Sequence, residues 1–292
     1  MSAVHEPVST TEPATAPEAA AGFVASGDDA LAPDFARRFG GLERLYGVSG
    51  ASRIRNAHVL VVGIGGVGSW AVEALARSGV GRLTLIDLDH VSESNINRQI
   101  HALDSTVGQA KVEAMRERIA QINAECRVLP IDEFVEPDNW PALLEAAQAA
   151  NGPVHAVIDA CDQVKAKLAM AAWARGVARG TDFVTVGAAG GKRLAHKVDI
   201  DDLSQVTHDP LLAQLRQRLR KSHGAPREGR KIGVTCVFSR ESVAPPDASC
   251  AIESGDGSLN CHGYGSVVSV TATFGQCAAG WVLDRVAANT TL

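Results

Sequence analysis

A glycine-rich turn is the first feature of the sequence whose residue types could bind a ligand. Gly63, Gly65, Gly66 and Gly68 directly follow the apolar run 58–62. Glycines permit a tight turn and a close approach of the backbone to phosphates, and the N-terminus of a following helix would supply N–H donors and a positive dipole. Asp87 ends the next apolar run, 24 residues past Gly63, where a carboxylate can accept ribose hydroxyls. The pattern by itself predicts a nucleotide site, with an NAD-dependent oxidoreductase as its ordinary meaning and a purely structural turn as the alternative.

Polar and charged residues beyond this turn favour ATP over NAD. Hydride transfer does not need cations beside the phosphates, whereas transfer of an adenylyl group does, because charge develops on the triphosphate. Aspartates at the end of a strand can hold Mg²⁺ through carboxylate and water. The residues in question are Asp89, Asn95, Arg98, Gln99, Lys111, Asp159 and Asp162. For three of them an ordinary structural role is the alternative: a solvated lysine at 111, a salt bridge at 98 and a helix cap at 162.

The elements that must position these residues alternate between strands and helices. Short apolar runs predict strands over 58–62, 82–87, 128–131, 154–159 and 183–186. Helical periods lie between them, over 67–78, 107–123, 139–149 and 164–177. This alternation predicts an α/β fold, a Rossmann-like, doubly wound and mostly parallel sheet with helices on both faces.

The composition is that of a globular protein. The chain has 292 residues, a formal net charge of −5 and 46% apolar residues, which excludes a disordered, collagen-like or disulfide-stapled chain. Residues 1–34 are rich in Ala, Pro, Ser and Thr, and we expect a disordered tail there, ahead of a domain over 35–288. The six cysteines form no Cys-x-x-Cys pair and no secretory signal is visible, so we expect a cytoplasmic location.

Five motifs together carry a resemblance to a known family. They read GIGGVGS, LIDLDHV, SNINRQ, VGQAK and VIDACD. This combination resembles the ATP-dependent E1-like superfamily of the ThiF and MoeB type, which adenylates carboxylates of sulfur-carrier and ubiquitin-like proteins, and the match runs over about residues 35–186. The resemblance implies that Gly65 and Gly66 approach the phosphates and that Asp87 holds the ribose.

The same resemblance implies which residues act in catalysis. Asn95, Arg98 and Lys111 would contact the triphosphate, and Asp159 would bind Mg²⁺ near the α-phosphate. Asp162 is a second candidate for the Mg²⁺ shell. ATP and Mg²⁺ are therefore the implied cofactors.

Three later segments narrow the resemblance to one branch of the superfamily. Residues 187–191, 209–211 and 233–241 resemble the tRNA threonylcarbamoyladenosine dehydratase branch. That branch uses ATP to close a modified adenosine of the anticodon loop, at position 37 of tRNA, to its cyclic form. The implied chemistry activates the threonyl carboxylate with ATP, and the neighbouring carbamoyl group then attacks within the same molecule, where proximity gives a large effective molarity. Whether AMP or ADP is the product stays open.

The resemblance also implies partners, and the sequence departs from the superfamily at two places. Relatives have Arg-Tyr-x-Arg-Gln near residue 40, with the second Arg reaching the neighbour's ATP in a homodimer; here Gly41 stands at that place, and Arg38 and Arg44 are the candidate substitutes. The two Cys-x-x-Cys zinc pairs are missing.

A homodimer and a cysteine desulfurase or sulfur-acceptor partner are implied by the resemblance. The alternatives are an activator of a sulfur-carrier or ubiquitin-like protein, and a nucleotide-binding relay scaffold without turnover.

A basic segment suits a tRNA substrate. Residues 214–231 contain seven Lys or Arg and one Glu, and such a strip on an otherwise acidic protein is the electrostatic footprint of a polyanion. The helix there is expected to open at Asp209 and Pro210, and Arg218 is expected to face a different side of it from Arg216 and Arg220. A solvated helix face is the alternative. The candidate tRNA-binding residues are Arg216, Arg220, Lys221, Arg227, Arg230 and Lys231, within an insertion over 188–262 that would face the substrate.

Two features near the C-terminus have competing interpretations. Residues 257–283 contain no charged side chain, but glycines dilute the apolar character, so a buried helix over 263–286 is favoured over a membrane span. Cys236 stands between β-branched residues and is interpreted as a small buried hydrophobe, with a sulfur-accepting thiol as the alternative. The roles of Cys250 and Cys261 stay open.

Overall fold

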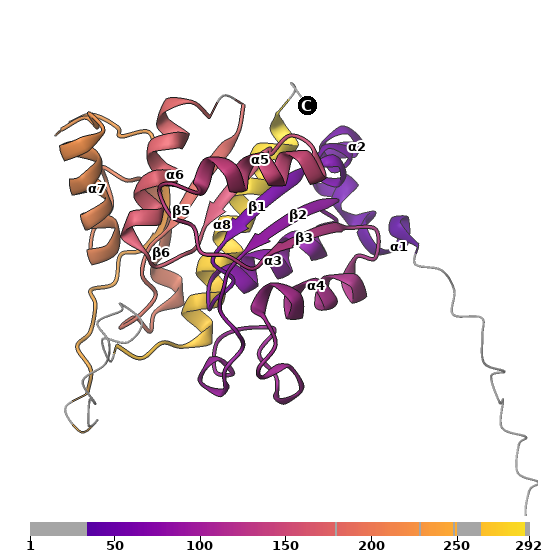
Figure 1. Cartoon of the computed structure of the whole chain (residues 1–292), viewed down its shortest axis with the longest axis horizontal. Coiled ribbons are helices and arrows are strands. Elements are labelled where there is room, and N and C mark those ends of the chain that lie inside the picture. Colours follow the sequence, from indigo (N-terminus) through magenta and orange to yellow (C-terminus); the bar gives the residue numbers. More distant parts are fainter. Residues whose placement is uncertain (1–33, 179, 228, 248, 250–263, 290–292) are drawn as a thin grey trace, which may run out of the picture. The chain divides into compact units, whose positions relative to one another are not determined.

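The computed structural model describes residues 34–178, 180–227, 229–247, 249 and 264–289, and the residues from Phe35 onward belong to one structural unit (Figure 1). The expected tail before Asp34 lies outside the described residues, as do Cys250 and Cys261.

A sheet of seven strands forms the middle layer of the described part of the chain. Its strand order is β3-β2-β1-β4-β5-β7-β6, and all neighbours are parallel except the antiparallel pair of β6 with β7. The doubly wound, mostly parallel sheet expected from the sequence is thereby confirmed. The strands are β1 (His58–Val62), β2 (Arg82–Ile86), β3 (Arg127–Ile131), β4 (Ala156–Asp159), β5 (Asp182–Val186), β6 (Val198–Asp202) and β7 (Thr235–Ser239).

Helices cover both faces of this sheet because the central strands are apolar on both sides. In β1, Val59 and Val61 pack with α3, α4 and α8, whereas Leu60 and Val62 pack with α5, α6 and α7. Alternate side chains of a strand point to opposite faces, so an uninterrupted apolar run builds two cores at once. The α-helices are α1 (Phe35–Phe39), α2 (Gly41–Asn56), α3 (Gly68–Arg77), α4 (Lys111–Ile122), α5 (Trp140–Asn151), α6 (Val164–Gly176), α7 (Pro210–Ser222) and α8 (Val268–Ala288). Short 3₁₀ turns are η1 (Glu93–Asn95), η2 (Asp104–Thr106) and η3 (Ala195–Lys197).

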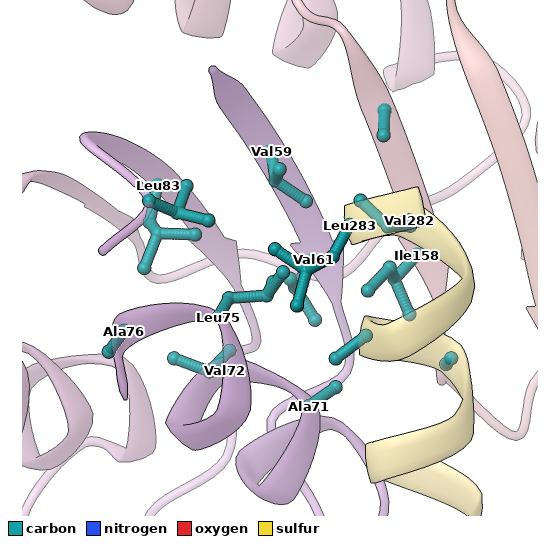
Figure 2. Close-up of a cluster of buried hydrophobic side chains, with 14 of the residues drawn as sticks. Val59, Val61, Ala71, Val72, Leu75, Ala76, Leu83, Ile158, Val282 and Leu283 are labelled. Atoms are coloured by element: carbon teal, nitrogen blue, oxygen red, sulfur yellow. The ribbon is translucent and has the colours of Figure 1, made fainter. Parts of the chain in front are cut away.

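Helix α8 crosses beneath the sheet and packs closely against α3. Figure 2 shows Val282 and Leu283 of α8 in one cluster with Ala71 and Leu75 of α3 and with strand side chains. No helix in the described part of the chain is long and apolar enough to cross a membrane. The described part of the uncharged stretch 257–283 begins at Tyr264. From Val268 onward it forms α8, and this helix lies largely in the core.

Several elements differ from the sequence-based expectation. α1 and α2 are not among the expected helices, and the C-terminal helix expected over 263–286 begins at Val268. The helix expected over 107–123 begins only at Lys111, because Gly108 adopts a φ of 89° and the residues around it bond back to the segment after β2, with the Lys111 N–H on the Asp89 carbonyl at 3.0 Å. β6 and β7 were not expected as strands. β6 carries aspartates at positions 199, 201 and 202, and its half-exposed place at the sheet edge tolerates them.

The α3–α8 crossing gives a prediction about stability. A Cβ atom on Gly275 would lie 2.8 Å from the Ala71 nitrogen and would overlap the Val67 carbonyl oxygen, so the two helices would have to move apart. We expect Gly275→Ala to lower the free energy of unfolding by about 1–3 kcal/mol, as in other overpacked cores. The matched control is Gly280→Ala on the same helix, where a Cβ atom meets nothing and the gain in helix propensity is about 0.5–1 kcal/mol. Chemical denaturation of both variants measures the difference; equal stability would contradict the close crossing.

Candidate nucleotide-binding site

The sheet topology creates a crevice where the predicted site residues lie. The chain runs from β1 outward to β3 and returns to β4 on the other side of β1. Ligands of doubly wound sheets bind at the carboxyl ends of the strands at such a switch point. A cavity of about 1010 Å³ lies there. The predicted residues that line it are Gly63, Gly65, Gly66, Asp87, Asp89, Asn95, Arg98, Gln99, Lys111 and Asp162.

The glycine turn after β1 is shaped by contact with the turn after β4. Gly63 has a φ of 84°, and a Cβ atom there would lie 2.7 Å from the Cys161 nitrogen and 2.9 Å from the Ala160 carbonyl. Gly68 does not line the cavity; a side chain on it would overlap the Gly63 carbonyl. Gly63 and Gly68 therefore permit the turn itself, while Gly65 and Gly66 present their backbone to the cavity.

Asp87 combines a structural role with a position suited to ribose. Its carboxylate accepts the N–H of Ile64 at 2.5 Å and that of Asp89 at 2.9 Å, so it ties the glycine turn to the end of β2. Burial raises the pKa of Asp87, and the nearby Lys111 offsets this only in part. Lys111 itself is buried and forms an ion pair with the half-exposed Asp89 at 2.6 Å. Lys111 is therefore a paired cation at the cavity wall, not a solvated lysine.

The segment around η1 brings a guanidinium and three amides to the cavity. Asn95 accepts the N–H of Ser92, and the guanidinium of Arg98 donates to the Ser94 carbonyl at 2.7 Å and to the Asn97 side chain. Arg98 makes no ion pair within the described residues, so its charge is available to an anion. Gln99 is buried, and its Oε1 has no hydrogen-bond partner in the part of the chain that the structure describes. A ligand donor would satisfy it.

The two aspartates that follow β4 have different positions. Asp162 lines the cavity. Asp159 does not: it is fully buried and its Oδ1 lies 3.1 Å from the Nζ of Lys167, which is also fully buried. The expectation that Asp159 is the cavity-facing Mg²⁺ ligand therefore finds no support in its position, because its carboxylate is directed into the core by this ion pair.

Of the two ends of the cavity, the apolar one was not expected from the sequence, whereas 187–191 and 209–211 at the other end belong to the segments that resemble the dehydratase branch. One end is apolar and is lined by Val62, Ile86, Phe134, Val135 and Ala166. The apolar run 134–135 within an acidic loop was the available signal. The opposite end is formed by 187–190, Pro210, Leu211, Val243 and residues 264–266. These segments follow the last of the nucleotide motifs in the chain, and only the fold brings them to the same crevice.

Helix α7 begins at this second end and carries the basic segment away from it. Asp209 caps the helix by accepting the N–H of Leu212, as expected, and also accepts the N–H of Ala188 at the cavity. Two arginines of the segment are anchored to the protein: Arg216 donates to the carbonyls of Leu203 and Val206, and Arg220 to that of Pro226. The exposed cations are Arg218, Lys221, Arg227, Arg230 and Lys231. Arg218 does face a different side from Arg216 and Arg220, and that side is the solvent.

Other residues singled out in the sequence lie away from the cavity. Cys236 on β7 is completely buried, and burial raises the pKa of its thiol far above the ordinary range, so its interpretation as a small core residue is confirmed. Neither Arg38 nor Arg44 lines the nucleotide cavity of its own chain. Arg38 donates to the Ile122 carbonyl and lines a separate cavity of about 820 Å³ beside α4.

Known proteins are similar to this chain in sequence and architecture. The ThiF family matches residues 37–289. The tRNA threonylcarbamoyladenosine dehydratase of Escherichia coli (strain K12) is 45% identical, over 87% of this chain and 94% of that protein, and that of Haemophilus influenzae is 42% identical over the same shares. The crystal structure of the E. coli dehydratase in complex with ATP has a TM-score of 0.74 at 44% identity and covers 86% of this chain and 94% of that one. The chain therefore belongs to the ThiF family.

Proposed function

We propose that the protein is an ATP-dependent tRNA threonylcarbamoyladenosine dehydratase, which closes the threonylcarbamoyl group of the modified adenosine to its cyclic form. The observation that carries this is the extent of the likeness: it includes the segments of the cavity beyond the nucleotide motifs, and the crystal structure of the E. coli relative is a complex with ATP. The cavity therefore has one end for a nucleotide and another end for a second reactant.

The chemistry follows from the substrate. A carboxylate is a poor electrophile, and ATP converts it to an acyl-phosphate or acyl-adenylate when a carboxylate oxygen attacks phosphorus and the rest of the nucleotide or the pyrophosphate leaves. The carbamoyl group of the same side chain then attacks the activated carbonyl carbon, and inorganic phosphate or AMP departs with the carboxylate oxygen. The net loss from the nucleoside is one water. Because both reacting groups belong to one molecule, proximity replaces an enzyme nucleophile.

The residues at the nucleotide end have distinct tasks in this proposal. Arg98 and Lys111 neutralise charge that develops on the triphosphate. Asp87 accepts ribose hydroxyls, and the apolar end around Phe134 receives the adenine ring. Backbone N–H groups at Gly65 and Gly66 approach the phosphates.

The cavity also fits Mg²⁺. This ion is usually bound through one or two carboxylates plus phosphate oxygens and waters, and Asp162 supplies a carboxylate at the cavity wall. Among the described residues, no group of three or more acidic, His or Cys side chains is arranged to hold a metal ion by itself. Asp162 rather than Asp159 would hold the ion. Bound Mg²⁺ would polarise the phosphoryl group and offset the charge of the leaving phosphates.

The proposal extends to partners and location. A tRNA substrate explains the exposed cations at the far part of α7 and the loop after it, which a carrier protein with a Gly-Gly tail does not require. This favours the dehydratase over a carrier-protein activator, the second candidate. A homodimer, a cysteine desulfurase or sulfur-acceptor partner, and a cytoplasmic location remain part of the proposal on the strength of the family resemblance.

Mass spectrometry of the nucleoside tests the function. The protein is incubated with ATP, Mg²⁺ and tRNA that carries threonylcarbamoyladenosine, and the nucleoside is then weighed. Loss of the mass of one water supports the proposal. An unchanged nucleoside, together with ATP-dependent adenylation of a carrier-protein tail, selects the second candidate.

The first site prediction concerns Asp162. Asp162→Asn removes the carboxylate charge that would anchor Mg²⁺, so we expect turnover to fall about 10²-fold, the size seen when one electrostatic stabiliser is lost. ATP affinity measured by calorimetry should lose its dependence on Mg²⁺. The control is Asp104→Asn, an exposed aspartate in η2 that does not line the cavity. An Asp162→Asn variant with wild-type turnover would place the ion elsewhere.

The second site prediction concerns the exposed cations. Changing Arg218, Lys221 and Arg230 together to Gln should weaken tRNA binding and reduce the magnitude of its log–log salt slope by about 2, since each phosphate contact contributes about 0.7–0.9. ATP affinity should not change. The charge-matched control replaces the exposed Arg55, Arg116 and Arg127, which lie outside the basic segment. Equal tRNA affinity in the two triple variants, by filter binding over a range of salt, would make the segment an ordinary solvated surface.

A further inference from the structure

A buried ion pair lies directly behind the wall of the nucleotide cavity. Lys167 of α6 and Asp159 at the end of β4 are both fully buried, with Nζ and Oδ1 3.1 Å apart. Thr185 of β5 completes the cluster: its hydroxyl donates to the other carboxylate oxygen at 2.6 Å, and the Lys167 Nζ lies 3.1 Å from that hydroxyl. Lys167 was not noticed in the sequence, although it stands among the apolar residues of a helical face, between Ala166 and Met170.

The pair is directed toward the turn that follows β4. Asp159 Oδ1 accepts the backbone N–H of Cys161 at 3.3 Å and its thiol at 3.1 Å. The next residue is Asp162, and Cys161 and Asp162 both line the cavity. Lys167 thus fixes a carboxylate, and the carboxylate fixes the backbone from which the proposed Mg²⁺ ligand extends.

The same turn also sets the shape of the glycine turn. The Cys161 nitrogen and the Ala160 carbonyl are the atoms against which Gly63 packs, and the Ala160 N–H donates to the Val62 carbonyl at 2.8 Å. A shift of this turn by a fraction of an ångström would therefore move the phosphate-facing backbone and the Asp162 carboxylate together.

The charges within the cluster support a fixed arrangement. Burial disfavours a charged Lys167, but Asp159 and the other acidic neighbours outweigh this and raise the pKa of Lys167. A buried charge with its partner in place is stable, whereas removal of one partner leaves the other uncompensated in the core. Replacing only one of the two residues should therefore destabilise the protein, whereas replacing both together should not leave an unpaired charge in the core.

We propose that Lys167 is a positioning residue for the ATP site: through Asp159 and Thr185 it holds the turn 160–162 in the geometry that the glycine turn and Asp162 require. This rests on the proposed function, and it reassigns Asp159 from metal ligand to intermediary. Lys167 does not line the cavity, so its effect on the site is transmitted through the hydrogen bond from Cys161 to Asp159.

Two double variants separate positioning from mere stability. Asp159→Leu with Lys167→Met replaces the pair by apolar side chains, a change that buried pairs often tolerate without loss of stability, but the introduced leucine cannot accept the Cys161 N–H. We expect a thermal midpoint close to that of the wild type and at least a tenfold weaker ATP affinity by calorimetry with Mg²⁺ present. Asp159→Asn with Lys167→Met removes both charges but keeps an acceptor oxygen. We expect this variant to bind ATP more tightly than the apolar one but more weakly than the wild type, because Thr185 still orients the acceptor oxygen whereas Lys167 no longer does.

The controls make the outcome decisive. Glu73→Gln disrupts another buried charge, which pairs with Arg77 and Arg118 beside the second cavity; it should lower the thermal midpoint and leave ATP affinity unchanged. Wild-type ATP affinity in the apolar double variant would overturn the proposal, since the pair would then serve only the fold. If that variant does not fold, Thr185→Val decides, because it removes only the hydroxyl that orients Asp159: weaker ATP binding supports the proposal and unchanged binding overturns it. ATP binding by the wild type is measured first, so a failure of the proposed function is recognised separately.

Discussion

The nucleotide site depends on one close backbone contact, between the turn after β1 and the turn after β4. These strands are neighbours, so their turns meet at the same edge of the sheet, and the Ala160 carbonyl and Cys161 nitrogen leave no room for a side chain at Gly63. The close fit leaves no space for a side chain between the turns, and Gly65 and Gly66, which follow, line the cavity. Other features of the site adjust to it: Asp87 holds the far side of the glycine turn through Ile64, and the Lys167–Asp159 pair holds the facing turn from within the core.

Much of this arrangement could be predicted from the sequence because it is local. The apolar runs at 58–62 and 82–87 differ from β1 and β2 by at most one residue, and the residues that immediately follow them line the cavity. The sequence could not reveal in which direction each aspartate side chain after β4 points. Asp159 and Asp162 are close together in one motif, and only the ion pair with Lys167 decides that the first is directed into the core and the second lies at the cavity. The place of Phe134 and of the segment 209–211 at the crevice could not be predicted for a different reason, since long-range packing brings these segments together.

The basic segment shows the same limit at the surface. Composition correctly identified a concentration of positive charge, but not which charges are available. Arg216 and Arg220 lie four residues apart on a partly buried side of α7, where their guanidinium groups satisfy backbone carbonyls. Arginine with its long apolar stem suits such a place. Arg218 and Lys221, on the opposite side, are exposed. Helical periodicity separates the two groups, but it cannot say which of them is in contact with the protein.

The course of α7 has a geometric consequence for substrate recognition. The helix starts at the cavity with Pro210 and Leu211, contains 13 residues and ends at Ser222 beside the exposed cations. At a rise of 1.5 Å per residue this is a rigid distance of about 20 Å. If tRNA phosphates bind at the distal end while the modified base enters the cavity, the length of α7 fixes the distance between these two contacts. It would select RNA by the span between a backbone anchor and a protruding nucleotide, and the identity of the intervening bases would matter little.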